Sequence, residues 1–215
     1  MSTASESTGS RTIASESTDS GNPLAPGLAL FGTSADPPTA GHRALLAGLA
    51  DTYGQVATWA SDNPFKQHGA SLAQRAALLQ RLVDDLADRR ISLQQELSSP
   101  RALTTLERAE ALWPGRELVF VVGGDLAAQV PHWYRAEELL RRCRLAVVPR
   151  QGFSLEAGAL ETLRQLGGRP ELLDLPIPAT ASSAVRARPD PAQLPAAVWN
   201  ELLKHNLYGL GQPRR

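Results

Sequence analysis

The sequence predicts an α/β fold organised around a doubly wound parallel sheet. Short apolar runs of strand length alternate along the chain with apolar-periodic segments of ten or more residues. Strands joined by helices of that length form parallel βαβ units with right-handed crossovers. Breaks that carry Gly or Ser, at Gly32, Gly123 and Ser182, lie at or just beyond the end of a predicted strand. Ligands of such sheets bind at the carboxyl ends of the strands, so we expect these three breaks to converge on one site.

The predicted elements follow from apolar patterning between turn signals. Leu72, Ala76, Leu79, Val83 and Leu86 recur at steps of three and four and mark one face of a long helix. The predicted strands are 28–32, 55–60, 91–96, 118–122, 145–148 and 171–175, of which 118–122 is the clearest buried strand. The predicted helices are 41–53, 72–86, 103 to the break at 113–115, a short one after 125, one ending at 143, 155–166, a short one after 183, and 194–206.

The composition is that of an ordinary globular protein. The chain has 215 residues, of which 42% are hydrophobic and 20% are charged, and this length suits one substantial core. The formal net charge is +0, so nothing points to a nucleic-acid or anionic-membrane partner, and no apolar run approaches the roughly 20 residues of a membrane span. Cys143 is the single cysteine, which excludes an internal disulfide and indicates a cytoplasmic protein. His68, His132 and His205 lack metal-ligand spacing, so we assign them no ligand role.

The first 24 residues differ in composition from the rest of the chain. They are rich in Ser and Thr, they nearly lack large apolar side chains, and they contain the pentapeptide Ala-Ser-Glu-Ser-Thr twice, at 4–8 and 14–18. Such a segment buries too little surface to offset its ordering entropy. We therefore predict a disordered tail over 1–24 and one domain over 25–211.

The segment from Leu28 to Leu46 has the local pattern of a phosphate-binding site. Its apolar run ends at Gly32, a polar loop with two prolines follows, and an apolar-periodic segment opens directly after Thr39. A strand, a Gly-bearing turn and a helix N-terminus present backbone N–H groups and the positive end of the helix dipole to an anion. Thr39 and His42 are three residues apart and therefore share one face of the first helical turn. The simpler interpretation is a Gly turn with Thr39 as an ordinary N-cap.

A second polar segment lies at 181–186 and reads Ala-Ser-Ser-Ala-Val-Arg. The hydroxyls of Ser182 and Ser183 at a helix N-terminus cap the helix or bind an anion, and Arg186 projects from the first turn. The planar guanidinium of Arg suits phosphate because it presents several donors and never loses its charge. Taken alone, two serines before a helix are more often only a cap.

Together, the two segments resemble the T/H-x-G-H and Ser-Ser/Thr-x-x-Arg motifs of the nucleotidyltransferase superfamily, the adenylyl- and cytidylyl-transferases. The loop at 32–37 reads Gly-Thr-Ser-Ala-Asp-Pro, and Ala35 replaces the aromatic residue that is usual there. Ala181 stands where a further Ser often precedes the second motif. The resemblance implies a Rossmann-like doubly wound parallel sheet of the nucleotidyltransferase type over 25–211, with a small C-terminal helical segment.

Three further stretches resemble bacterial nicotinate-nucleotide adenylyltransferases, particularly cyanobacterial ones. A strand ends in Gly-Gly-Asp at 123–125, Trp133 and Tyr134 form an aromatic pair, and Pro-Arg-Gln-Gly follows a strand at 149–152. In that family the aromatic pair flanks the nicotinate ring. The resemblance extends over about 28–208. Phe65 departs from it, because the family usually has His before the basic residue, and so does Ala102, where a Thr helps to hold the nicotinate carboxylate.

The resemblance implies that the phosphate of nicotinate mononucleotide attacks the α-phosphorus of ATP, which yields nicotinate adenine dinucleotide and pyrophosphate in NAD biosynthesis. The implied catalytic residues are His42, as donor to the α-phosphate, Thr39 beside it, and Arg186 at the pyrophosphate end. The residues implied in ATP binding are Gly32, Thr33, Ser34, Thr39, His42, Gly123, Asp125, Ser182, Ser183 and Arg186. Those implied in binding the second substrate are Asp36, Lys66, Trp133, Tyr134 and Arg150. Mg²⁺ is expected to bridge the phosphates without a dedicated protein metal site.

Two other functions remain open on the sequence. A pantetheine-phosphate adenylyltransferase commonly has Thr in the first motif, but it lacks the Trp-Tyr and Pro-Arg-Gly stretches. A catalytically inactive nucleotide-binding or regulatory protein is favoured by Ala35, Ala102 and Ala181, which replace residues usual in the family. The expected partners are ATP and nicotinate mononucleotide, with no nucleic acid and no membrane, and homo-oligomerisation is left open.

Overall fold

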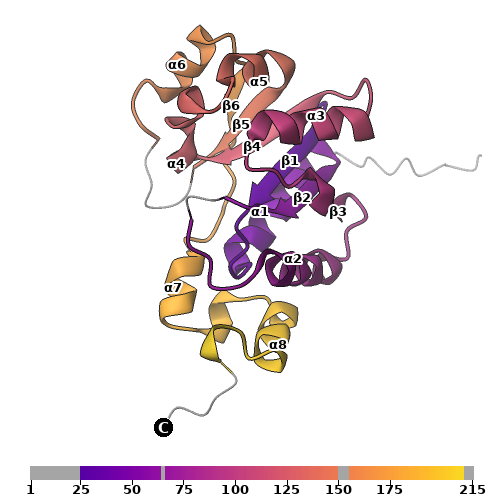
Figure 1. The fold of residues 1–215 in the computed structure, drawn as a ribbon, viewed down its shortest axis with the longest axis vertical. Helices are drawn as coiled ribbons and strands as arrows, with labels where there is room; N and C mark the ends of the chain where they lie inside the picture. The colour runs from indigo at the N-terminus through magenta and orange to yellow at the C-terminus, as the bar shows by residue number, and fades with distance from the viewer. Residues whose placement is uncertain (1–24, 64–65, 150–154, 211–215) are drawn as a thin grey trace, which may run out of the picture.

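A six-stranded parallel sheet forms the centre of the protein in the computed structural model, which describes residues 25–63, 66–149 and 155–210 (Figure 1). The strands are β1 (Leu28–Thr33), β2 (Val56–Ala60), β3 (Ile91–Leu93), β4 (Leu118–Gly123), β5 (Arg144–Val148) and β6 (Pro170–Leu172). They lie in the order β3-β2-β1-β4-β5-β6, and every neighbouring pair is parallel. The prediction of a doubly wound parallel sheet is confirmed. The tail at 1–24 and Arg150 lie outside the described residues.

The order of the strands places a crevice between β1 and β4. The chain builds outward from β1 through β2 to β3, returns to the centre for β4, and then builds through β5 to β6 on the other side. The connections that leave β1 and β4 therefore diverge at the carboxyl ends of two adjacent strands. Open α/β sheets bind their ligands at such a switch point.

Helices cover both faces of the sheet. They are α1 (Ala40–Tyr53), α2 (Leu72–Leu86), α3 (Ala102–Leu112), α4 (Gly124–Ala127), α5 (Ala136–Arg142), α6 (Ala159–Gln165), α7 (Ser182–Ala187) and α8 (Ala196–Lys204). Short 3₁₀ turns are η1 (Gln95–Leu97), η2 (Val130–His132), η3 (Pro191–Gln193) and η4 (Leu207–Gly209). None of the helices in the described ranges is long and apolar enough to cross a membrane.

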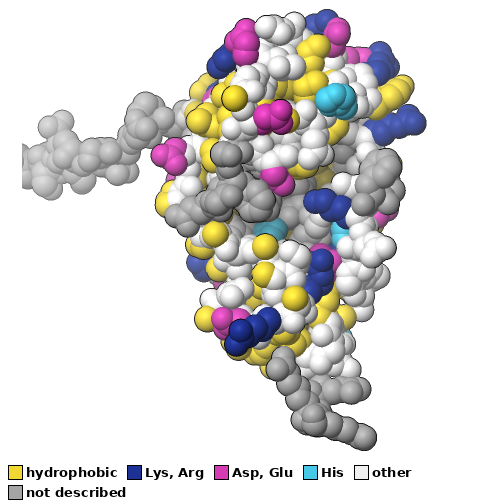
Figure 2. All heavy atoms as spheres, turned by 90° about the vertical axis from the view of Figure 1, so that its left-hand side faces the viewer, with side chains coloured by type: hydrophobic (Ala, Val, Ile, Leu, Met, Phe, Trp, Pro, Cys, Tyr) yellow, Lys and Arg dark blue, Asp and Glu magenta, His cyan; other side chains and the backbone are white. Residues whose placement is uncertain are grey.

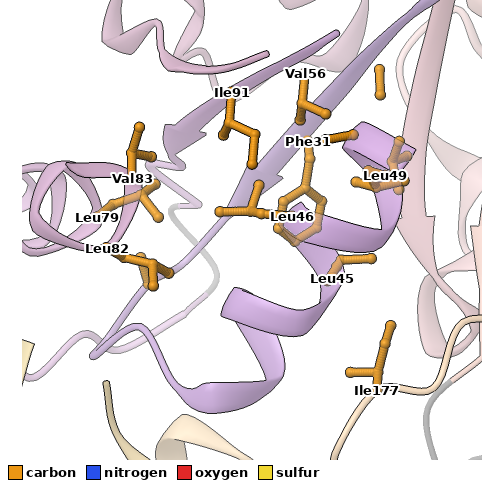
Figure 3. Close-up of a cluster of buried hydrophobic side chains, with 14 of the residues drawn as sticks. Phe31, Leu45, Leu46, Leu49, Val56, Leu79, Leu82, Val83, Ile91 and Ile177 are labelled. Carbon is orange, nitrogen blue, oxygen red and sulfur yellow. The ribbon is translucent and has the colours of Figure 1, made fainter. Parts of the chain in front are cut away.

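The alternation of side chains along β1 divides the core into two clusters. Ala29 and Phe31 face α1, α2 and α8, whereas Leu28 and Leu30 face α3, α5 and α6. Figure 3 shows Phe31 in one apolar cluster with side chains from α1, α2, β2 and β3, namely Leu45, Leu46, Leu49, Val56, Leu79, Leu82, Val83 and Ile91. Because both faces of β1 are buried, its carboxyl end is held rigidly where the site begins.

Three predicted elements are shorter than their patterns indicated. The strand predicted at 91–96 ends at Leu93, because the Gln95 side chain bonds both the N–H and the C=O of Ala60 (2.9 Å each) and the chain turns into η1. The helix predicted at 155–166 begins at Ala159, because Gly158 has a left-handed φ of 82°. The strand predicted at 171–175 ends at Leu172, and Leu175 packs against Gly48 on α1.

Candidate active site

A pocket of about 480 Å³ opens at the carboxyl ends of β1 and β4. Its walls come from the loop after β1, the start of α1, the end of β4, the loop before α2, and the segment that leads into α7. The predicted site residues that line it are Gly32, Thr33, Ser34, Asp36, Thr39, His42, Lys66, Gly123, Asp125, Ser182, Ser183 and Arg186. The expected convergence of Gly32, Gly123 and Ser182 is thus confirmed. In the face of the molecule that Figure 2 shows, this pocket is the hollow near the middle, with His and Lys or Arg side chains around it.

Both ring nitrogens of His42 are held: Nδ1 contacts the backbone N–H and the hydroxyl of Thr39, and Nε2 contacts the hydroxyl of Thr33. Nδ1 lies 3.1 Å from the backbone nitrogen of Thr39, whose N–H donates to it, and 2.9 Å from Thr39 Oγ1. A backbone N–H can only donate, so Nδ1 is an acceptor and the neutral ring carries its proton on Nε2. Nε2–H donates to Thr33 Oγ1 at 2.8 Å. The ring is therefore orientated with its donor facing the end of β1.

Thr39 and Gly41 bring the segment before α7 against the start of α1. Thr39 is fully buried at the N-cap of α1, and its hydroxyl donates to the carbonyl of Thr180 at 3.2 Å. A Cβ on Gly41 would lie 3.0 Å from the carbonyl oxygen of Pro178, so a larger residue would push that segment away. The T-x-G-H pattern thus joins two walls of the pocket, in addition to placing His42.

Gly32 is required by the packing beneath the pocket floor. A Cβ at this position would lie 2.6 Å from the indole of Trp59, a buried side chain of β2. The Trp59 ring contacts Phe120 edge-on at a centroid distance of 6.3 Å, and Phe120 contacts Trp133 in the same way at 6.2 Å. This aromatic row supports the ends of β1 and β4 from the side of the sheet opposite α1.

The carboxylate of Asp36 is the centre of a cluster that also contains His68, Arg186 and Tyr208, which we term the Asp36 cluster. Asp36 is 1% exposed, and its oxygens accept from the N–H groups of Gly69 (2.8 Å) and Ala70 (3.2 Å). Arg186 Nη1 donates to the carbonyl of Asp36 at 2.5 Å and lies 3.2 Å from Oδ2. Asp36, predicted as a substrate contact, is therefore engaged in holding Arg186.

Arg75 is a buried cation behind this cluster that the sequence analysis did not identify. It is 1% exposed and donates to the carbonyls of Ser34 (2.7 Å), Ser61 (2.8 Å) and Ala70 (3.2 Å). Burial lowers the pKa of its guanidinium, and the nearby negative charge of Asp36 opposes that shift. The sequence contained one sign of this buried arginine, because Arg75 lies three residues after Leu72 and therefore on the otherwise apolar face of the helix.

His68 lies in the pocket, although we assigned it no ligand role. Its Nδ1 is 3.7 Å from Asp36 Oδ2, and its Nε2 is buried without a hydrogen-bond partner among the described residues. A buried imidazole nitrogen without a partner is costly unless a ligand or water pairs with it. The sequence places His68 only two residues after Lys66, and that proximity was the available signal.

The aromatic pair lies outside the pocket. Trp133 is partly buried against Phe120, and Tyr134 is 54% exposed. Arg101 directly precedes Ala102 at the start of α3, and its guanidinium carbon lies 4.4 Å from the centroid of the Tyr134 ring. Ser182 opens α7, and its hydroxyl donates to the carbonyl of Pro37 at 2.9 Å.

Comparison with known proteins agrees with this geometry. The family model described as Cytidylyltransferase-like matches residues 30–188. A probable nicotinate-nucleotide adenylyltransferase of Synechocystis is 42% identical over 197 residues, which is 84% of this chain and 98% of that protein. Its counterpart from Chlorobaculum tepidum is 31% identical over 195 residues, 84% and 97% of the two chains.

A solved structure shares the fold at low sequence identity. Nicotinic acid mononucleotide adenylyltransferase of Plasmodium falciparum, complexed with NaAD, superposes with a TM-score of 0.67 at 17% identity and covers 85% of this chain and 97% of its own. The family match, the relatives and the pocket at the switch point all lead to the same assignment. The chain belongs to the cytidylyltransferase-like family and, within it, to the nicotinate-nucleotide adenylyltransferases.

Proposed function

We propose that this protein transfers the adenylyl group of ATP to the phosphate of nicotinate mononucleotide. A phosphate oxygen of the mononucleotide forms a bond to the α-phosphorus of ATP, and the bond from that phosphorus to the pyrophosphate oxygen breaks. The products are nicotinate adenine dinucleotide and pyrophosphate. The observation that carries the proposal is that His42 and Arg186, which are distant in sequence, line one pocket at the carboxyl ends of β1 and β4.

His42 is the donor to the α-phosphate in this proposal. Its Nε2–H, which donates to Thr33 Oγ1, turns to an α-phosphate oxygen when ATP is bound. Negative charge builds on that oxygen during the transfer, so an orientated donor lowers the barrier. The backbone N–H of Thr39 keeps the proton on Nε2 because it donates to Nδ1. No covalent nucleophile is needed, because positioning and charge stabilisation dominate transfer at phosphorus.

Arg186 and Ser183 hold the pyrophosphate end of ATP on the opposite wall. Arg186 is 30% exposed, so its guanidinium reaches the pocket while Nη1 stays with Asp36. Among the described residues, no group of three or more His, Cys, Asp or Glu side chains could hold a metal ion. A Mg²⁺ ion bound through the phosphate oxygens would neutralise their charge. The exposed carboxylate of Asp125, at the start of α4, lines the pocket and would bind such an ion or one of its water ligands.

The pyridine ring is assigned to the surface beside Tyr134. An exposed aromatic face next to a guanidinium suits an aromatic ring that carries a carboxylate. Arg101, 4.4 Å from the Tyr134 ring, supplies a positive charge directly beside Ala102. This arrangement favours nicotinate mononucleotide over nicotinamide mononucleotide, because the carboxamide of the latter carries no charge.

The test is a coupled assay for pyrophosphate release from ATP with three acceptors. We expect turnover with nicotinate mononucleotide, less with nicotinamide mononucleotide, and none with phosphopantetheine. Turnover with phosphopantetheine alone would assign a different acceptor to the pocket. ATP binding without pyrophosphate release from any acceptor would instead indicate a nucleotide-binding protein without this activity.

A further inference from the structure

The C-terminal turn η4 reaches the same carboxylate that holds Arg186. The phenol of Tyr208 donates to Asp36 Oδ1 at 2.6 Å, across 172 residues of sequence. The other oxygen, Oδ2, accepts from Gly69 N–H and lies 3.2 Å from Arg186 Nη1. One nearly inaccessible carboxylate therefore connects the end of the chain to the cation on the pocket wall.

Tyr208 and Arg186 also share a packing surface at Gly69. A Cβ on Gly69 would lie 2.7 Å from Tyr208 Cε1 and 3.0 Å from Arg186 Cδ. The missing side chain thus leaves a slot that both groups fill. Any residue with a side chain at 69 would displace the tyrosine ring, the stem of the arginine, or both.

The turn that carries Tyr208 is held in an unfavourable backbone conformation. Asn206 (φ 48°) and Tyr208 (φ 56°) both lie in the left-handed region, which side chains disfavour. The turn follows α8, which is anchored by the buried side chains of Val198 and Leu202. Burial and the hydrogen bond to Asp36 raise the pKa of the Tyr208 phenol, so it remains a donor across the neutral range.

We propose that Tyr208 is a positioning residue that holds Arg186 towards the triphosphate by fixing the carboxylate of Asp36. The inference rests on the proposed role of Arg186 in ATP binding. Without the phenol, Oδ1 keeps only the longer bond from Ala70 N–H (3.2 Å), so the carboxylate is held less firmly by the remaining donors on Oδ1 and Oδ2. Arg186 forms an ion pair with the same carboxylate, so it then keeps its bond to the Asp36 carbonyl but is directed less firmly towards the pocket.

The experiment measures the dissociation constant for ATP by calorimetry on the full-length chain, without a second substrate. We expect Tyr208→Phe to weaken ATP binding about tenfold, the size of one lost hydrogen bond to a charged group. In an Arg186→Ala background the same substitution should change the constant less than about twofold, because its effect passes through Arg186. Equal effects in both backgrounds, or unchanged affinity in the single variant, would overturn the proposal.

The matched control is Tyr53→Phe, which removes a phenol that donates to Glu171 at 2.5 Å and lies away from the pocket. It should leave ATP affinity at the wild-type value. Gly69→Ala provides a second route, since it keeps the Tyr208 hydroxyl but displaces the ring, and it should weaken ATP binding as Tyr208→Phe does. ATP affinity of Gly69→Ala equal to wild type would contradict the shared packing surface.

Steady-state kinetics separates this inference from the proposed function. We expect Tyr208→Phe to raise the KM for ATP and to leave the KM for nicotinate mononucleotide unchanged, which a general loss of folding would not do. A wild-type protein that binds ATP but does not use nicotinate mononucleotide would refute the proposed function. The comparison of ATP affinities with and without Arg186 would still decide the role of Tyr208.

Discussion

Two tyrosines, the buried Tyr53 and the partly buried Tyr208, donate to carboxylates at opposite ends of the sheet, and their surroundings differ. At the amino end, Tyr53 at the end of α1 donates to Glu171 at 2.5 Å, and Glu171 also accepts from Arg144 at 2.5 Å. These residues belong to helices and strands. At the carboxyl end, Tyr208 in the short turn η4 donates at 2.6 Å to Asp36 in the loop after β1. The same chemistry thus reinforces regular elements at one end and organises a pocket wall at the other.

The polar groups at the carboxyl end are arranged for position as well as stability. There, the described residues place a buried carboxylate, a buried guanidinium and an imidazole nitrogen without a partner in the loops after β1 and β2 and the first turn of α2. Buried polar groups of this kind add little net stability but determine a single arrangement. Substitutions at the carboxyl end should therefore change ATP binding or turnover, with a loss of stability where a buried group loses its partner, whereas those at the amino end should change stability alone.

The largest effect on stability is expected from Arg75→Ala. This change leaves three buried carbonyls without their donor and removes the cation near Asp36, so the free energy of unfolding should fall by about 3–5 kcal/mol. Urea denaturation measures it. Arg43→Ala is the control, because Arg43 is an exposed side chain whose pair with Asp85 should contribute at most about 1 kcal/mol. Equal losses for the two variants would show that Arg75 does not support the pocket loops.

The largest effect on turnover at nearly unchanged stability is expected from His42→Ala. Loss of the orientated donor should lower kcat by a factor of about 100 or more, measured as pyrophosphate release. Tyr53→Phe, at the other end of the sheet, should retain wild-type kcat. Unchanged turnover in His42→Ala would remove the mechanism proposed for the pocket.

A smaller effect is expected from Tyr53→Phe itself. Loss of its hydrogen bond to Glu171 should lower the free energy of unfolding by about 1.5 kcal/mol, with no change in ATP affinity. Thermal or urea denaturation and calorimetry together check both parts. A loss of ATP affinity in this variant would erase the distinction between the two ends.

The smallest effect is an alkaline loss of stability that both tyrosines share. Burial and a carboxylate partner raise the pKa of Tyr53 and of Tyr208 above the ordinary value of 10.0. Above pH 10 the unfolded chain releases these protons and the folded chain keeps them, so stability falls as pH rises, by about 1.4 kcal/mol per pH unit for each group. Each Tyr→Phe variant should show a shallower decline in urea denaturation. Burial raises the pKa of Cys143 to about 12, and this thiol adds the same pH dependence of stability to the wild-type protein and to both Tyr→Phe variants. An unchanged slope in both variants would contradict the burial of these phenols.

The sequence was sufficient for the features that local pattern encodes. Apolar periodicity reports burial, so it predicted the strands and the two-sided cover of helices. Gly32, Thr39 and His42 were predicted because a strand, a turn and a helix N-terminus lie within one short segment. These groups line the pocket as expected.

The remaining features depend on contacts between distant segments. Asp36 and Tyr208 are 172 residues apart, and no local pattern relates them. Arg75 and His68 acquire their roles only when the loops after β1 and β2 meet. Trp133 was expected beside the substrate, and its packing against Phe120 is likewise a tertiary contact.

A structure of the protein with a non-hydrolysable ATP analogue would test the central claim most directly. We predict that His42 Nε2 lies within about 3.2 Å of an α-phosphate oxygen while Arg186 contacts the terminal phosphates of the same molecule. A triphosphate bound away from His42, or one that leaves Arg186 turned towards solvent, would contradict the account.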